Sequence, residues 1–181
     1  MKPANILLSL DPVAGGLTAK IGDFGLSRRT EDIMTVMTAL VGTIQYMAPE
    51  MLTAAAAGQS EYSAAVDIYS FAIILWQLLT CGSPFVRELE DYGRVGLLHR
   101  IAREGLRPEV PAWSPPALSA LIRECWADAE HMRPTSTEVV RRLWQVHHVE
   151  CGADGSSDVA SAVRVVAPQS IRLGRRESFP R

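Results

Sequence analysis

The segment 63–79 restricts the possible folds most, because it is apolar on nearly every side. A helix that is hydrophobic all round belongs in the middle of a core, and Gly82 with Pro84 predicts its end. The apolar run 71–79 contains Gln77 and has about half the length needed to cross a bilayer, so we expect no membrane span. Its apolar positions are Ile68, Phe71, Ala72, Ile73, Ile74, Leu75, Trp76, Leu78 and Leu79.

The other segments predict a hairpin, a long loop and further helices around this core helix. Residues 5–8 and 19–22 are typical of short strands, with turn residues between them. From 23 to 41 periodicity is lost, which indicates a long loop of functional importance or disorder. We expect helices at 49–57 and 91–103, the second closed by Gly105. The predicted fold class is mostly α.

Two helix starts carry capping signals. Ser114 is the expected N-cap of a helix that has Pro115 at its first position and runs to about Ala127. Thr135 and Glu138 match a capping box, in which hydroxyl and carboxylate each satisfy an orphan amide. The expected apolar face of this last helix is Val139, Val140, Leu143 and Trp144.

Composition sets the domain organisation and excludes some partners. After about residue 150 small and charged residues replace apolar ones, so we expect one domain at 1–150 and a disordered tail at 151–181. A net charge of −2 gives no reason to expect nucleic acid or an anionic membrane as partner. The cysteines, Cys81, Cys125 and Cys151, are odd in number and unrelated in spacing. They favour an intracellular, reducing setting such as the cytoplasm.

Three motifs occur in a fixed order along the first third of the chain. The run from Lys2 to Asn5 reads Lys-Pro-Ala-Asn and precedes the predicted hairpin, and Asp23-Phe24-Gly25 follows it. The third motif runs from Gly42 to Glu50 and reads Gly-Thr-Ile-Gln-Tyr-Met-Ala-Pro-Glu. A single tripeptide such as Asp-Phe-Gly arises often by chance, but the three together in this order do not.

This combination resembles the eukaryotic-type serine/threonine protein kinases. The kinase catalytic loop reads H-R-D-L-x-x-x-N, and the chain supplies its end, with Met1 in the place of the leucine and Asn5 as the asparagine. The resemblance implies the C-terminal, helical lobe of the kinase-like fold, starting just after His-Arg-Asp, with the N-terminal lobe absent. Trp76, the pair Cys125-Trp126 and the run Gly105-Leu106-Arg107-Pro108 are similar to the tyrosine-kinase-like branch.

The resemblance also implies site residues, with ATP and Mg²⁺ as cofactors. Asp23 and Asn5 would each hold a Mg²⁺ ion, for which oxygen ligands are suited. Lys2 would stabilise the transferring phosphate, and Thr43 would touch the catalytic base. Leu7 joins Lys2, Asn5 and Asp23 as an expected ATP contact.

Other residues of the resemblance are expected to hold the architecture. Phe24 and Gly25 would set the state of the long loop. Glu50 would pair in a buried position with Arg133, and the Asp67 carboxylate would receive amides of the catalytic loop. Ala72 departs mildly from the glycine that most kinases have there.

The implied partners are proteins with serine or threonine acceptors, and possible upstream kinases. Phosphorylation orders such loops through new phosphate–arginine pairs, and an exposed polar loop is the competing interpretation. The candidate sites are Thr30, Thr35, Thr38 and, in the tail, Ser178.

The sequence lacks a glycine-rich loop, a lysine strand, an αC glutamate and His-Arg-Asp. We therefore expect this chain alone to be inactive, and we expect exposed apolar surface around Leu7, Phe24 and Ile74. The alternative is a non-catalytic docking or scaffold module that binds kinases or their substrates through the face at 91–113. The preserved pair Asn5 and Asp23 favours the kinase, because a docking module has no need of them.

Overall fold

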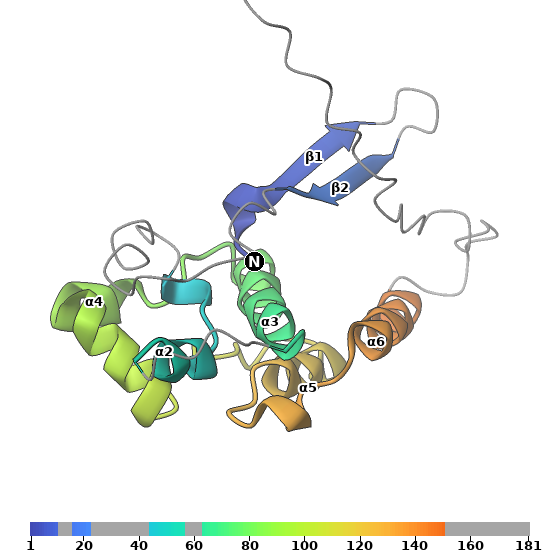
Figure 1. Ribbon diagram of the computed structural model, residues 1–181. Helices are drawn as coiled ribbons and strands as arrows, with labels where there is room; N and C mark the ends of the chain where they lie inside the picture. Colours follow the sequence, from blue (N-terminus) through green and yellow to red (C-terminus); the bar gives the residue numbers. More distant parts are fainter. Residues whose placement is uncertain (11–15, 23–43, 57–62, 151–181) are drawn as a thin grey trace, which may run out of the picture.

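The computed structural model describes residues 1–10, 16–22, 44–56 and 63–150 (Figure 1). It is mostly helical with one small antiparallel hairpin, so the predicted fold class is confirmed. The elements in chain order are η1 (Pro3–Asn5), β1 (Ile6–Leu10), β2 (Leu17–Ile21), η2 (Ile44–Tyr46), α2 (Pro49–Ala56), α3 (Ala65–Thr80), α4 (Val86–Arg103), α5 (Pro116–Cys125), η3 (Glu130–Met132) and α6 (Ser136–Glu150).

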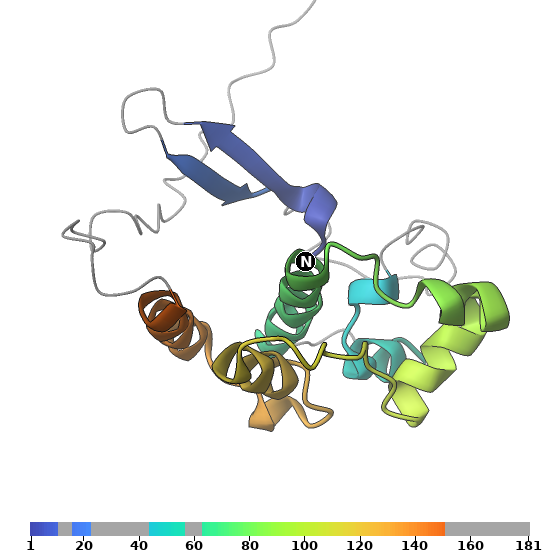
Figure 2. The same ribbon diagram turned by 180° about the vertical axis from the view of Figure 1, so that it is seen from behind.

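Helix α3 is the centre of the molecule, as its apolar sequence predicts. It lies between α2 and α4 on one side and α5 and α6 on the other, in both views (Figures 1 and 2). Tyr69, Ala72 and Ile73 of α3 are fully buried. The prediction that this helix is buried on nearly every side is wrong for its last turn, where Leu78 is 70% exposed.

The core around α3 is built by the apolar faces of its neighbours. Leu97 and Ile101 of α4 and Leu121 and Ile122 of α5 are buried with it in one cluster. Cys125 belongs to this core, and burial raises the pKa of its thiol to about 12, so it acts as a small apolar residue. Among the described residues, no helix combines the length and the apolar character needed to cross a membrane.

Three helix boundaries differ from the sequence prediction for local reasons. Helix α3 ends at Thr80, because Cys81 adopts a left-handed conformation (φ 52°, ψ 20°) one residue before Gly82. Helix α5 begins at Pro116 with Pro115 at the N-cap position and ends at Cys125, before Ala127. Ser114 is therefore not the N-cap; its hydroxyl is buried and has no hydrogen-bond partner.

Helix α4 starts at Val86 rather than at 91, and it is broken inside. Gly93 has φ 62° and ψ −174°, a backbone conformation that is essentially restricted to glycine. The break divides α4 into two helical pieces, which explains why no single apolar periodicity covers its whole length. Three residues later, a Cβ at Gly96 would lie 2.6 Å from the Cβ of Tyr92, so this second glycine makes room for the tyrosine.

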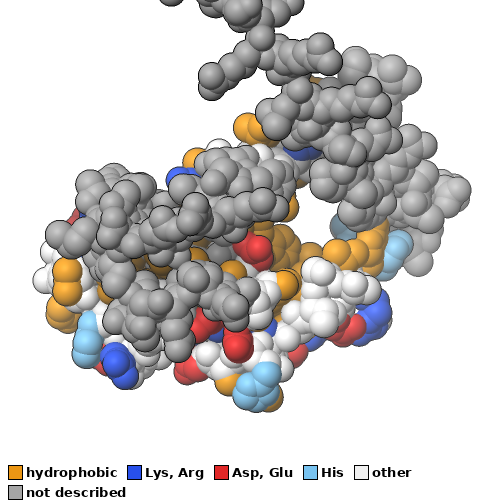
Figure 3. All heavy atoms as spheres, viewed as in Figure 1, with side chains coloured by type: hydrophobic (Ala, Val, Ile, Leu, Met, Phe, Trp, Pro, Cys, Tyr) orange, Lys and Arg blue, Asp and Glu red, His pale blue; other side chains and the backbone are white. Residues whose placement is uncertain are grey.

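The hairpin is longer than predicted and lies beside the helices. Ile6 pairs with Ile21 and Leu10 with Leu17, so the strands extend closer to the turn than 5–8 and 19–22. Its large apolar side chains are exposed: Leu7, Leu8, Leu10, Leu17 and Ile21. Figure 3 shows hydrophobic side chains gathered around the opening between the hairpin and α6. Exposed apolar surface around Leu7 agrees with expectation, but Ile74 is buried and was wrongly included.

Helix α6 is attached to α5 by both apolar and charged contacts. Val139 is buried, whereas Val140 is 44% exposed and does not belong to the predicted apolar face. The Thr135 hydroxyl accepts the amide of Glu138 at 3.3 Å, but the Glu138 carboxylate accepts from Arg141 instead of completing the box. Arg142 donates twice to Glu124 of α5, which lowers the pKa of that carboxyl group.

We predict that Gly93→Ala lowers the free energy of unfolding by about 1–3 kcal/mol, measured by urea denaturation. An added Cβ would meet nothing within 4 Å, so the cost comes from the backbone conformation alone. The control is Gly16→Ala, which also points into open space but has no positive φ, and should be neutral or slightly stabilising. Equal effects of the two substitutions would show that the break at Gly93 is not a glycine-dependent conformation.

Candidate functional site

The hairpin brings the end of the first motif close to Gly22, the residue before the second motif. The first motif forms the turn η1, which the amide of Asn5 closes by donating to the Lys2 carbonyl at 3.0 Å. At the other end of the hairpin, the amide of Gly22 donates to the Asn5 carbonyl at 2.7 Å. Gly22, the last described residue before position 23, therefore lies beside Asn5.

The backbone at Gly22 packs against Leu7 and Asn5. A Cβ there would lie 3.5 Å from the Leu7 side chain and 3.7 Å from the Asn5 carbonyl oxygen, which is ordinary van der Waals contact. Lys2 and Asn5 are half-buried, while Leu7 is 61% exposed and presents an apolar surface next to them.

Several predicted site residues lie outside the described residues, namely Asp23, Phe24, Gly25 and Thr43. The candidate phosphosites Thr30, Thr35, Thr38 and Ser178 lie outside them too, as does the predicted tail. Expectations for these positions stay predictions.

The donor set suits Mg²⁺ and not a transition metal. The amide oxygen of Asn5 and the carboxylate of Asp23 are hard oxygen ligands, and Mg²⁺ typically binds through one or two carboxylates plus substrate phosphates. In the described part of the chain, no group of three His, Cys, Asp or Glu side chains is placed to hold a metal ion. The oxygen donors of Asn5 and Asp23 would fit a metal that arrives with a phosphate ligand.

Asp67, at the start of α3, contacts the beginning of the first motif. Its Oδ1 lies 3.3 Å from the N-terminal ammonium nitrogen of Met1, the residue before Lys2, and the two groups form an ion pair. Two thirds of the Asp67 side chain remain exposed to solvent. The first turn of the core helix thus contacts the residue before Lys2.

The structure brings Glu50 and Arg133 together in a two-pronged ion pair. Nη1 and Nη2 of Arg133 donate to the two carboxylate oxygens of Glu50 at 2.5 and 2.8 Å. The remaining donors of Arg133 bind main-chain oxygens of Ala127, Ala65 and Asp128. All five N–H groups of the guanidinium are satisfied, which is what a fully buried arginine needs.

A second arginine at this place was missed by the sequence reasoning. The guanidinium carbon atoms of Arg107 and Arg133 lie 5.0 and 5.2 Å from the ring centre of Tyr69, within cation–π range. Arg107 also pairs with Asp128 at 2.5 Å. Burial raises the pKa of Tyr69 to about 12, and its hydroxyl has no hydrogen-bond partner. The tyrosine acts as a neutral aromatic surface for both cations.

The segment from Ile44 to Glu50 makes further contacts that the sequence motifs did not predict. Gln45 donates to the Pro84 carbonyl at 2.6 Å, and the Tyr46 hydroxyl donates to Gln77 of α3 at 2.7 Å. From α3, the hydroxyl of Ser70 donates to the Tyr46 carbonyl at 2.8 Å. The backbone at Tyr46 and the side chain at Glu50 are therefore both fixed to the helical core.

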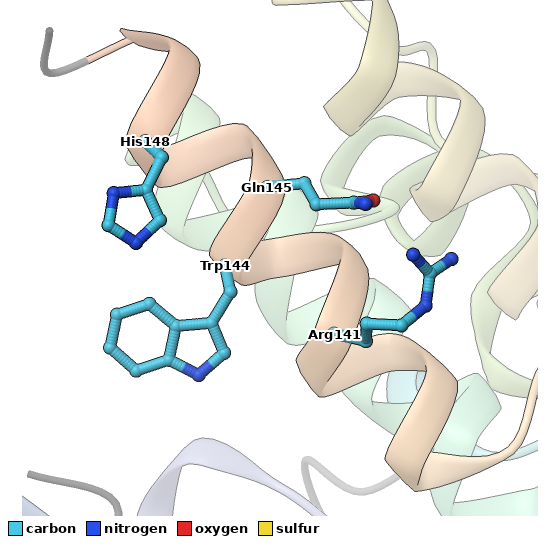
Figure 4. A pocket seen from close by; sticks show the side chains of 4 residues that line it. All are labelled: Arg141, Trp144, Gln145 and His148. Atoms are coloured by element: carbon cyan, nitrogen blue, oxygen red, sulfur yellow. The ribbon is translucent and has the colours of Figure 1, made fainter. Parts of the chain in front are cut away.

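A surface hollow beside α6 offers no comparable chemistry. Its lining residues all come from that helix: Arg141, Trp144, Gln145 and His148. In Figure 4, Trp144 and His148 lie on one side of the helix, and Gln145 and Arg141 point to the other. Polar groups that point apart do not converge on one ligand, as a specific binding site requires.

Comparison with known proteins identifies the family. The protein kinase domain profile matches residues 1–145. The chain belongs to the protein kinase family. Its relatives include the probable serine/threonine-protein kinase roco11 of Dictyostelium discoideum, 35% identical over 146 residues that cover 81% of this chain and 9% of that protein. Another is the serine/threonine-protein kinase STY17 of Arabidopsis thaliana, which is 34% identical over 147 residues. The match covers 81% of this chain and 23% of that protein.

The kinase chain spans only a small part of these relatives, less than a quarter of each of the two. A third relative, the dual specificity protein kinase shkE of Dictyostelium discoideum, is 33% identical over 149 residues, with 81% of this chain and 19% of that protein covered. The matches support the eukaryotic-type serine/threonine kinase family that the motifs predict.

In this kinase segment, we predict that Glu50→Gln lowers the free energy of unfolding by roughly 3 kcal/mol, because it leaves the Arg133 charge buried without its partner. A quarter of the Glu50 side chain is exposed, which keeps the cost at the low end for broken buried pairs. The control is Glu138→Gln, which breaks an exposed pair within one helix and should cost less than about 0.5 kcal/mol. If both substitutions lowered the free energy of unfolding by similar amounts, the buried Glu50–Arg133 pair would contribute no more to stability than an exposed pair, which would contradict this prediction.

We also predict that Tyr69→Phe leaves the kinase segment equally stable or stabilises it by about 1 kcal/mol, since it removes an unpartnered buried hydroxyl. Tyr69→Leu, which also loses the aromatic face under two guanidinium groups, should be clearly destabilising. Chemical denaturation of both variants decides the matter. A Phe variant that is less stable than the Leu variant would mean that the hydroxyl, and not the ring, is what the site requires.

Proposed function

We propose that this chain forms the C-terminal lobe of an ATP-dependent serine/threonine protein kinase. The observation that carries the proposal is the hydrogen bond of 2.7 Å from Gly22 to Asn5. It lies between Gly22, the residue before the Asp-Phe-Gly motif, and the end of the Lys-Pro-Ala-Asn motif. This supports the proposal that Asn5 and Asp23, 18 positions apart in the sequence, serve one site. This is the juxtaposition that metal-assisted phosphoryl transfer needs.

Each residue has a separate part in this proposal. When bound, Mg²⁺·ATP supplies the phosphoryl group and neutralises part of its charge. Asn5 and Asp23 orient the metal through oxygen ligands, and the Lys2 ammonium group stabilises negative charge on the transferred group. Leu7, exposed on β1, offers the apolar contact for the nucleotide. Thr43 orients the proton-accepting aspartate, which the family places directly before Met1.

The segment from Ile44 to Glu50 is proposed to face the protein substrate. Its backbone is fixed by Ser70 at Tyr46 and its end by Arg133 at Glu50. Positioning of this kind lowers a barrier by holding the acceptor hydroxyl in reach of the phosphate. The proposed substrates are proteins that present serine or threonine hydroxyl groups.

The alternative is a docking module without catalysis. In its favour, three large side chains of the 91–113 face are more than half exposed, namely Tyr92, Val95 and Trp113. Against it, docking gives no reason to keep the oxygen ligands Asn5 and Asp23 at the two ends of one hairpin. We therefore put the kinase first.

We predict that the 181-residue chain by itself transfers no measurable phosphate to a generic protein substrate, because its sequence contains no group for the proton-accepting role and no glycine-rich loop. The same segment joined to an upstream catalytic aspartate and N-terminal lobe should phosphorylate serine or threonine with radiolabelled ATP. Activity of the short chain alone, or inactivity of the joined protein, would contradict the proposal.

Within the joined protein, Asp23→Asn should lower kcat by at least about 10²-fold, the usual cost of losing one charge-stabilising group. The matched control is Glu90→Gln, which makes the same carboxylate-to-amide change at an exposed position of α4 and should leave kcat unchanged. Equal activity of both variants would rule Asp23 out as a metal ligand.

A further inference from the structure

Arg107 and Arg133 share one set of acceptors although they come from different loops. Arg107 follows α4, and its Nε donates to the Trp126 carbonyl at 3.0 Å. Arg133 follows η3, and it donates to the next two carbonyls, those of Ala127 at 2.9 Å and Asp128 at 3.3 Å. The turn from Trp126 to Asp128 is therefore divided between the two guanidinium groups.

The ring of Tyr69 is the second bridge between the two arginines, since both guanidinium groups lie over it at about 5 Å. Two cations around one buried ring repel each other unless each has its own counter-charge. The structure supplies these separately, Asp128 for Arg107 and Glu50 for Arg133. Asp128 contacts both arginines, with its carboxylate on one and its carbonyl on the other.

Arg107 is itself locked in place. Its Nη1 donates to the carbonyls of Ile101 and Leu106, at 3.3 and 2.8 Å, at the end of α4 and just beyond it. Near these bonds, Gly105 has φ 65°, and a Cβ there would lie 3.4 Å from the Asp128 carboxylate. A continuous series of contacts thus leads from the end of α4 through Arg107 to the Trp126–Asp128 turn and the Tyr69 ring, which also contact Arg133.

We propose that Arg107, with Asp128, is a positioning residue for the substrate-facing segment from Ile44 to Glu50. It acts through Tyr69 and the Trp126–Asp128 carbonyls on the Arg133–Glu50 pair, and so couples the loop after α4 to that segment. The role in substrate positioning rests on the proposed kinase function. The coupling between Arg107 and the Arg133–Glu50 pair does not, because it is a property of the folded chain. A planar fork is required at position 107, because lysine cannot bind four separate acceptors in fixed directions.

The coupling is tested first in the 181-residue chain by a double-mutant cycle with Arg107→Lys and Glu50→Gln, followed by urea denaturation. No hydrogen bond or ion pair joins these two residues directly, so independent effects would combine to within about twofold in the unfolding constant. We expect a departure of more than about threefold. The control cycle pairs Glu50→Gln with Arg142→Lys, which weakens the separate pair with Glu124, and should be additive. Additivity in both cycles overturns the coupling.

The side-chain Nε–Hε signal of Arg133 in NMR spectra provides a readout that does not require the double variant to fold. Arg107→Lys should shift this signal, because the ring and carbonyls around the guanidinium move, whereas Arg142→Lys should leave it in place. An unshifted signal in a folded Arg107→Lys chain would contradict the proposal.

The functional step is tested in the active kinase that contains this segment. Arg107→Lys should raise KM for the protein substrate by about three- to tenfold and leave KM for ATP unchanged, since only substrate positioning is altered. A residue that merely supports folding would reduce the amount of active enzyme without changing either KM. An inactive parent enzyme would refute the proposed function, whereas an active parent with an unchanged KM in Arg107→Lys would refute this inference alone.

Discussion

The architecture of this kinase segment depends on the buried guanidinium of Arg133. A charge taken out of water is tolerated only when its donors are satisfied and a counter-charge is present. Here the five donors reach Glu50 of α2, the Ala65 carbonyl at the start of α3, and two carbonyls of the turn after α5. One side chain therefore fixes the relative positions of three helices and the end of the segment proposed to face the substrate.

The segment proposed to bind phosphate is organised by simpler contacts. The hairpin is closed by a hydrogen bond from Gly22 to Asn5, and Asp67 in the first turn of α3 pairs with the N-terminal ammonium group of Met1. Because α3 also anchors Tyr46 through Ser70, the same buried helix contacts both segments that we propose to bind phosphate and substrate. This explains why the most apolar segment of the sequence carries polar residues near its first turns.

Much of this could be predicted from the sequence, and the failures have local causes. The core helix and the hairpin follow from apolar patterning and turn residues, and the Glu50–Arg133 contact follows from the resemblance to protein kinases. The start of α5 was predicted one residue too early, because Ser114 is a typical N-cap residue. In the structure Pro115 takes the N-cap position, and the Ser114 hydroxyl is buried without a partner. The role of Arg107 was hidden because its partners are main-chain oxygens and a ring, and neither leaves a pattern in the sequence.

The central claim is that Lys2 and Asn5 are the end of a kinase catalytic loop. Its most direct test is the sequence of the native transcript upstream of the Met1 codon. The account predicts that the three codons directly before Met1 encode His-Arg-Asp in frame, with a glycine-rich loop and a lysine strand further upstream. An in-frame stop codon immediately before Met1 would contradict it and would leave the docking module as the better description.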